Sequence, residues 1–98
     1  METIANIGNN KIINIDGNNF SNIEEFYNEV VNKFSLPNWF GRNLDAFNDM
    51  LSELTMEHIV IWENSNKSKK ELNYIKNNET LFNILIEIIN NHVQLILK

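Results

Sequence analysis

The sequence predicts an α/β fold, a small three-stranded parallel sheet packed with about four helices. Three short apolar runs have the length and composition of strands: Lys11–Ile15, His58–Trp62 and Val93–Leu97. The segments between them carry apolar residues at helical spacing, and helical crossovers between consecutive short strands imply a parallel sheet with right-handed connections. A chain of 98 residues has room for one core, so residues 1–98 are predicted to form a single domain.

The first ten residues have only a weak secondary-structure pattern, and a strand and a helix are predicted after them. Residues 1–10 are expected to form an extra strand or a loose arm. The first strand, Lys11–Ile15, is followed by an Asp-Gly turn signal. Ser21 and Glu24 have the spacing of a capping box, which predicts a helix that continues to about Ser35. Its apolar residues recur at helical spacing: Ile23, Phe26, Tyr27, Val30, Val31 and Phe34.

A loop and a second helix follow in the stretch "LPNWFGRNLDAFND", Leu36–Asp49. Pro37–Gly41 is predicted as a loop, in which Gly41 is expected to adopt a positive φ. Asn43 is a plausible N-cap for the helix. One apolar stripe then predicts the buried face of that helix: Leu44, Phe47, Leu51 and Leu54.

The opposite face of this second helix is acidic. Asp49 lies nearly opposite the apolar stripe, and Asp45 and Glu53 fall within roughly 60° of Asp49 at about 100° per residue. Two interpretations of these carboxylates stay open. In the first, Asp45 complements the helix dipole and Asp49 is an ordinary solvated charge; in the second, both contact a partner. Glu53, near the helix end, is expected at a wetter rim.

The second half of the chain repeats the strand and helix pattern. His58–Trp62 is a continuous apolar run, which predicts a strand covered on both faces. A short helix is expected at about Lys69–Lys76. The last helix is expected at about Glu79–Asn90, opened by Thr80 or Asn78.

Composition and motifs exclude most catalytic classes. Thirteen acidic against eight basic residues give a net charge of −5, which disfavours nucleic-acid binding because phosphates would be repelled. There is no cysteine, no Gly-rich phosphate loop and no pair of histidines at metal-ligand spacing, so we expect no enzyme activity, no cofactor and no metal. His58 and His92 are interpreted as structural. Asparagine occurs 20 times, scattered along the chain, and is interpreted as a lineage bias.

The location of the protein is predicted from two missing signals. The N-terminus has neither the basic nor the apolar region of a signal peptide. Polar residues interrupt the longest apolar stretch, Leu81–Leu97, so no membrane span or membrane partner is expected. The cytoplasm is therefore the default location.

The stretch Leu36–Leu51 also resembles a known family signature. It is similar to the barstar-like proteins, intracellular inhibitors of a small secreted ribonuclease. Their pattern runs Leu-Pro, two aromatics, Gly, any residue, Asn-Leu-Asp-Ala, and a second Asp four residues after the first. Ten positions match: Leu36, Pro37, Trp39, Phe40, Gly41, Asn43, Leu44, Asp45, Ala46 and Asp49. The segment "INIDGNNFSNIEEFYNEV" looks like the family's first strand and helix.

This resemblance implies a barstar-like fold and a ribonuclease inhibitor that binds one basic secreted ribonuclease. The inhibitor's helix and the loop before it would block the active site, with carboxylates in place of RNA phosphates. Asp49 would enter a phosphate site, Asp45 would meet a second basic or polar group, and Trp39 would offer a flat aromatic surface. The expected partner-binding residues are Trp39, Gly41, Asn43, Asp45, Asp49 and Glu87. Glu87 is matched across a gap, and a solvated charge is its alternative.

The chain departs from the family pattern at three positions. Where the prototype of the family has a tryptophan between the two aspartates, this chain has Asn48, and Leu54 aligns with another prototype aromatic. Arg42 replaces an acid. A barstar-fold interaction module with a partner other than a nuclease is therefore the alternative function. A second apolar stripe on the last helix, Phe82, Ile86 and Ile89, would be either buried or available for self-association.

Overall fold

The fold is organised around a three-stranded parallel sheet with the strand order β1-β2-β5. The strands are β1 (Ile12–Asp16), β2 (Ile59–Glu63) and β5 (Gln94–Leu97). The computed structural model describes residues 12–55 and 57–98, so the expected strand or arm at residues 1–10 lies outside the described residues. The α/β class and the parallel three-stranded sheet are confirmed.

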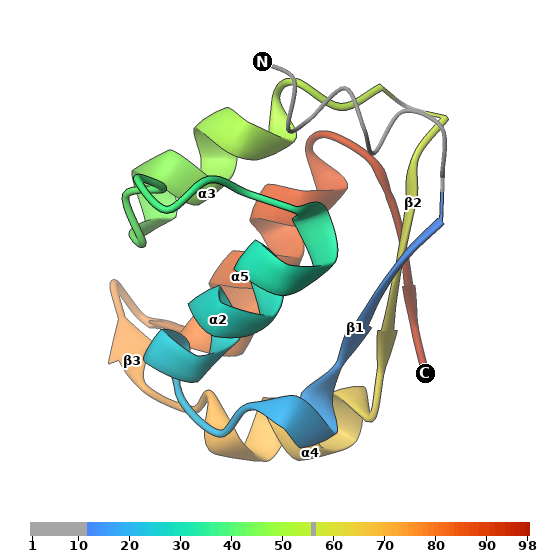
Figure 1. Cartoon of the computed structure of the whole chain (residues 1–98). Coiled ribbons are helices and arrows are strands. Elements are labelled where there is room, and N and C mark those ends of the chain that lie inside the picture. The colour runs from blue at the N-terminus through green and yellow to red at the C-terminus, as the bar shows by residue number, and fades with distance from the viewer. Residues whose placement is uncertain (1–11, 56) are drawn as a thin grey trace.

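Helices pack on one side of this sheet. Figure 1 shows α2 (Ile23–Phe34), α3 (Leu44–Leu51) and α5 (Leu81–Asn90) on the same side, and α4 (Ser65–Glu71) at the end where β1 and β2 finish. Both crossovers move in the same direction across the sheet, from β1 to β2 and from β2 to β5. Right-handed crossovers that advance in one direction place their helices on one side.

The sheet is consequently buried on one face, not on two. Val60 and Trp62 of β2 are fully buried, whereas Ile59 and Ile61 on the other face are partly exposed. Ile12, paired with Ile59 in the register, is 47% exposed. The prediction of a strand covered on both faces was wrong, because a continuous apolar run does not reveal on which side its crossover helices will lie.

The core is an aromatic cluster under the helices. The Trp62 ring stacks on Phe26 with centroids 5.6 Å apart and meets Phe20 and Phe82 edge-on at 5.9 and 5.3 Å. Phe47 of α3 meets Phe26 of α2 edge-on at 5.4 Å, which ties the second helix to the first. Offset and edge-on pairs at these separations add to the area-based stabilisation of the core.

The first helix is capped one residue later than the sequence predicts. Asn22 is the N-cap, and its side chain accepts a hydrogen bond from the Glu25 N–H at 2.9 Å. The Glu25 carboxylate in turn accepts from the Ser21 N–H at 2.7 Å. The predicted Ser21 capping box was therefore wrong by one residue. The end at Ser35, which has the left-handed φ of 54°, agrees with the prediction.

The next short helix, α4, lies earlier than the predicted Lys69–Lys76. It spans Ser65–Glu71 and follows Asn64, which has a φ of 56°. Lys67 donates to the carbonyl oxygens of Gly17 and Phe20, so contacts distant in sequence hold this helix. The polar composition of the segment has no apolar period from which its bounds could be predicted.

A small hairpin replaces the predicted end of that helix. Strands β3 (Ile75–Lys76) and β4 (Glu79–Thr80) pair antiparallel. Their two-residue turn consists of Asn77 and Asn78, with φ of 54° and 68°, as a type I′ turn requires. Thr80 caps α5 as predicted, but the helix begins at Leu81 rather than Glu79.

The second apolar stripe of α5 is used inside the fold. Phe82 and Ile89 are buried, and Ile86 packs against the core from a half-buried position. The helix packs against β5, α3 and α4, and Figure 1 shows it on the same side of the sheet as α2. Phe82 and Ile89 are therefore used inside the fold, and self-association through this stripe stays a prediction.

Candidate functional site

The loop before α3 separates its two aromatic residues. Phe40 is buried, and its ring packs on that of Tyr27 with centroids 6.0 Å apart. The Phe40 N–H donates to the Pro37 carbonyl at 3.1 Å, which closes a tight turn. Trp39 is left 73% exposed, as predicted. An exposed indole on an anchored loop is available to a partner at little entropic cost.

Gly41 serves close packing rather than a positive φ, so that prediction was wrong. None of the described glycines has a positive φ, and the left-handed conformation falls on Arg42, with φ 53°. A Cβ at Gly41 would lie 3.1 Å from the Ala46 Cβ and 3.3 Å from the Asn43 Nδ2. Gly41 therefore lets the loop approach the first turn of α3 closely.

Asn43 starts α3 as predicted. Its Oδ1 accepts from the Ala46 N–H at 2.7 Å and its Nδ2 donates to the Gly41 carbonyl at 3.2 Å. The helix ends at Leu51, earlier than the apolar stripe suggested, and Leu54 is buried from a turn in which its N–H donates to the Leu51 carbonyl. Of the predicted stripe, Leu44 is only half-buried.

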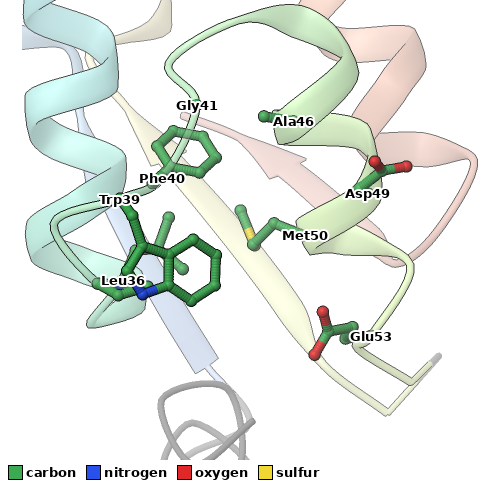
Figure 2. Close-up of a pocket in the computed structure, with 9 residues that line it drawn as sticks. Leu36, Trp39, Phe40, Gly41, Ala46, Asp49, Met50 and Glu53 are labelled. Carbon is green, nitrogen blue, oxygen red and sulfur yellow. The ribbon is translucent and has the colours of Figure 1, made fainter.

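A groove lies between the loop and α3, and we refer to it as the Trp39 groove. Its volume is about 210 Å³. Figure 2 shows Trp39 on the loop side, Met50 between the two walls, and Asp49 and Glu53 on the α3 side. The groove is lined by Leu36, Pro37, Trp39, Phe40, Gly41, Ala46, Asp49, Met50 and Glu53. It is thus an apolar groove whose α3 wall carries two carboxylates.

A second concavity, the Asp45 hollow, lies beside the first turn of α3. It has a volume of about 390 Å³. It is lined by Ile23, Glu24, Tyr27, Arg42, Asn43, Leu44, Asp45 and Lys76. Asp45 therefore shares its hollow with two cationic residues, Arg42 and Lys76, whereas no described Lys or Arg lines the groove of Asp49.

The structure thus divides the predicted partner-binding residues among three places. Trp39, Gly41 and Asp49 line the Trp39 groove. Asn43 and Asp45 line the Asp45 hollow. Glu87 lines neither concavity and is exposed on α5.

Glu87 has an acidic neighbour of its own. The Glu79 carboxyl, just before α5, shares a hydrogen bond with the Glu87 side chain, and this contact with the charge of Glu87 raises the pKa of Glu79 above its ordinary value. Two carboxylates in contact concentrate negative charge at this point of the surface.

The three departures from the family pattern have visible structural roles. The Arg42 guanidinium donates to the Glu24 carbonyl at 3.0 Å and the Asn28 Oδ1 at 2.6 Å, so its charge is directed onto α2. The Asn48 Oδ1 lies 2.8 Å from the His92 Nε2, joining α3 to the turn after α5. Leu54 is buried and offers no surface to a partner.

Sequence reasoning missed two residues of the groove. Met50 is buried at its floor although it is outside the predicted apolar stripe. Glu53 lines the groove although it was expected at a rim. The shorter helix accounts for Glu53, because the turn after Leu51 redirects the chain, whereas Met50 lies within α3 on the side that faces the loop. The apolar character of Met50, adjacent to Leu51, was the only available signal.

The described residues offer no metal site and no membrane-spanning helix. Within residues 12–55 and 57–98, no group of three or more His, Asp or Glu side chains could hold a metal ion. The two histidines have different neighbours. His58 is buried and contacts Thr55, whereas His92 contacts Asn48. No helix in the same described residues is both long and apolar enough to cross a membrane.

Comparisons with known proteins agree with the geometry. A family model described as "Barstar (barnase inhibitor)" matches residues 10–94. A protein of Bacillus subtilis (strain 168), named "Putative ribonuclease inhibitor YrdF", is 48% identical over 42 residues. That match covers 43% of this chain and 45% of the relative, so the chain spans less than half of the length of that protein.

Proposed function

Because the chain belongs to the barstar family, we propose that it is a proteinaceous inhibitor of a basic, secreted ribonuclease. In this proposal, α3 and the loop before it cover the active site of the ribonuclease in a complex of one inhibitor with one enzyme. The chain itself is not an enzyme, and it acts in the cytoplasm by occupying the site where RNA would bind.

The observation that carries the proposal is the exposed Trp39 beside an acidic helix. A ribonuclease binds a polyanion, so its active site presents Arg, Lys and His side chains. Carboxylates on a helix can make charge-assisted hydrogen bonds with such groups, and Asp49 lies on the exposed side of α3. Trp39 is 73% exposed and would contribute the large rigid contact area typical of interface hot spots.

The two concavities suggest how the expected residues divide their roles. Asp49 would pair with the cations of a phosphate site, since no cationic residue among the described ones lines its groove. Asp45 shares its hollow with Arg42 and Lys76, so the partner group that it meets would be polar and not purely cationic. Glu87, next to Glu79, would meet a further basic group at the interface edge.

A module that binds a partner other than a nuclease is the second candidate. It is favoured by the exposed aromatic and apolar residues of the hairpin, Tyr74 and Ile75, which are 68% and 59% exposed. It is also favoured by the loss of aromatic surface at Asn48 and Leu54. Co-purification with secreted basic proteins of the source organism, read by mass spectrometry, separates the two candidates.

The direct test is inhibition of a ribonuclease recovered in this way. RNA cleavage is measured while the purified chain is added, and activity should fall linearly to an end point at one inhibitor per enzyme. Recovery of only non-nuclease partners would refute the proposal. A recovered ribonuclease that stays fully active at an excess of the chain would refute it as well.

A further inference from the structure

The Trp39 groove contains a carboxylate that the inhibitor mechanism above does not use. In Figure 2 the Glu53 carboxylate points toward the loop that carries Trp39, and the Asp49 carboxylate points away from that loop. We propose that Glu53 and Trp39 together receive one arginine side chain of the partner, and that Glu53 determines this specificity. The inference rests on the proposed function only in taking the arginine to belong to a ribonuclease.

The floor of the groove suits the stem of an arginine. Leu36, Phe40 and Met50 line it with apolar surface. The three methylene groups of an arginine side chain can lie along such a surface while the charged end stays near water. A short polar or anionic side chain would gain nothing from this floor, since it would lose hydration without a matching partner.

The walls suit the guanidinium group. The Trp39 indole lies on one side with most of its surface open, and tryptophan is the aromatic side chain with the strongest attraction for a cation within about 6 Å of its ring. Glu53 lies on the other side, where a planar guanidinium stacked on the indole can donate two parallel hydrogen bonds to a carboxylate. A lysine ammonium cannot reproduce both contacts.

The charge of this site is not already neutralised within the described part of the chain. No ion pair joins Asp49 or Glu53 to a Lys or Arg among residues 12–55 and 57–98. Arg42, the basic residue of the same loop, is held on α2 by Glu24 and Asn28. An arginine from the partner would therefore supply the positive charge that the described lining of the groove lacks.

A turn after the helix sets the position of Glu53. The helix ends at Leu51, and the Glu53 N–H donates to the Met50 carbonyl at 3.2 Å. The Ser52 hydroxyl donates to the Asp49 carbonyl at 2.6 Å, which also fixes this turn. A continuous helix would have directed Glu53 elsewhere, so its place in the groove depends on this turn.

A first experiment tests the groove without a ribonuclease. The ¹⁵N-labelled chain is titrated with the peptide acetyl-Gly-Arg-Gly-amide and with its citrulline analogue, which has the same shape and no charge. We expect saturable shifts of the Trp39 indole N–H with the arginine peptide alone, weakened roughly fivefold or more in Glu53→Gln. Glu63→Gln, which removes a carboxylate at the far end of β2, should bind as the unsubstituted chain does. Equal shifts with citrulline, or an unchanged Glu53→Gln, would overturn the inference.

A second experiment uses the ribonuclease recovered by co-purification. Glu53→Gln should weaken inhibition roughly tenfold, while Glu63→Gln leaves it unchanged. Intact inhibition by Glu53→Gln would overturn the inference and leave the proposed function standing. Shifts specific to the arginine peptide in a chain that inhibits no ribonuclease would support the groove chemistry and refute the proposed function.

Discussion

Among single residues, Asp49 is expected to contribute most to the affinity for the ribonuclease. It lies on the exposed face of α3, opposite the residues that α3 buries. Asp49→Ala would leave partner cations unpaired in a desolvated cleft, at a cost of about 2–5 kcal/mol in binding free energy. The free energy of unfolding should change by less than about 0.5 kcal/mol, because the position is exposed. Isothermal titration with thermal melts measures both.

Glu63→Ala is the matched control for this prediction. It removes the same charge from the protein at an exposed position outside the two concavities. Similar small losses of affinity for Asp49→Ala and Glu63→Ala would mean that the acidic face of α3 is merely solvated.

Ser68 is expected to matter for stability and not for binding. Its hydroxyl oxygen accepts the hydrogen bond of the Trp62 indole N–H at 3.0 Å, and both side chains are fully buried. Ser68→Ala leaves that donor unpaired, which should lower the free energy of unfolding by about 1–3 kcal/mol. Urea denaturation measures the loss. Ser52→Ala is the control, because its exposed hydroxyl bonds only the Asp49 carbonyl three residues earlier and its loss leaves no buried donor unpaired; an equal effect of the two substitutions would contradict this account.

At the level of elements, the hairpin before α5 depends on its two asparagines. Asn77 and Asn78 both adopt left-handed φ values, which cost an ordinary residue roughly 1–2 kcal/mol. Asn78→Ala should therefore lower the free energy of unfolding by about 1 kcal/mol, whereas Asn78→Gly should be neutral or stabilising. Chemical denaturation of the pair tests this, and a harmless Asn78→Ala would show that the turn does not constrain the fold.

The start of α5 carries a pH-dependent destabilisation. Contact with Glu87 raises the pKa of Glu79 above its ordinary value of 4.5, so the folded chain binds this proton more tightly than the unfolded chain. The penalty is present when Glu79 is ionised and disappears as the pH falls below 4.5. Glu79→Gln should therefore raise the melting temperature near pH 7 and have little effect near about pH 3.5. A gain that persists at the lower pH would contradict this cause.

At the level of the whole molecule, the net charge of −5 should govern how fast a basic partner is met. Salt screens this attraction, since the Debye length falls from about 10 Å at 0.1 M to about 3 Å at 1 M. The association rate constant with the ribonuclease should fall about tenfold or more over that range, with a much smaller change in the dissociation rate. Stopped-flow mixing at several salt concentrations measures both. A salt-independent association rate would exclude electrostatic steering.

Several features were determined by the sequence alone because they depend on near neighbours in the chain. Strand composition and helical spacing predicted the parallel sheet, and the Leu36–Leu51 stretch identified the family. Asn43 was recognisable as an N-cap because a cap bonds within three residues of itself. Trp39, expected to offer a flat aromatic surface, is exposed.

The high asparagine content concealed other features that also depend only on neighbouring residues. The frequent asparagines were interpreted as compositional, yet Asn22 caps a helix and Asn64, Asn77 and Asn78 take left-handed conformations. In a chain with 20 asparagines, a functional asparagine cannot be distinguished by residue type alone. The hairpin and the true start of α2 were missed for this reason.

Only the tertiary structure decided which faces are covered and which residues share a concavity. The single buried face of the sheet follows from two crossovers on one side, and the burial of Phe82 and Ile89 follows from neighbours far away in sequence. Asp45 and Asp49, one helical turn apart, belong to different concavities because the loop packs against one side of α3. Periodicity specifies the direction of a side chain from its own helix axis, whereas a site depends on what another segment places opposite it.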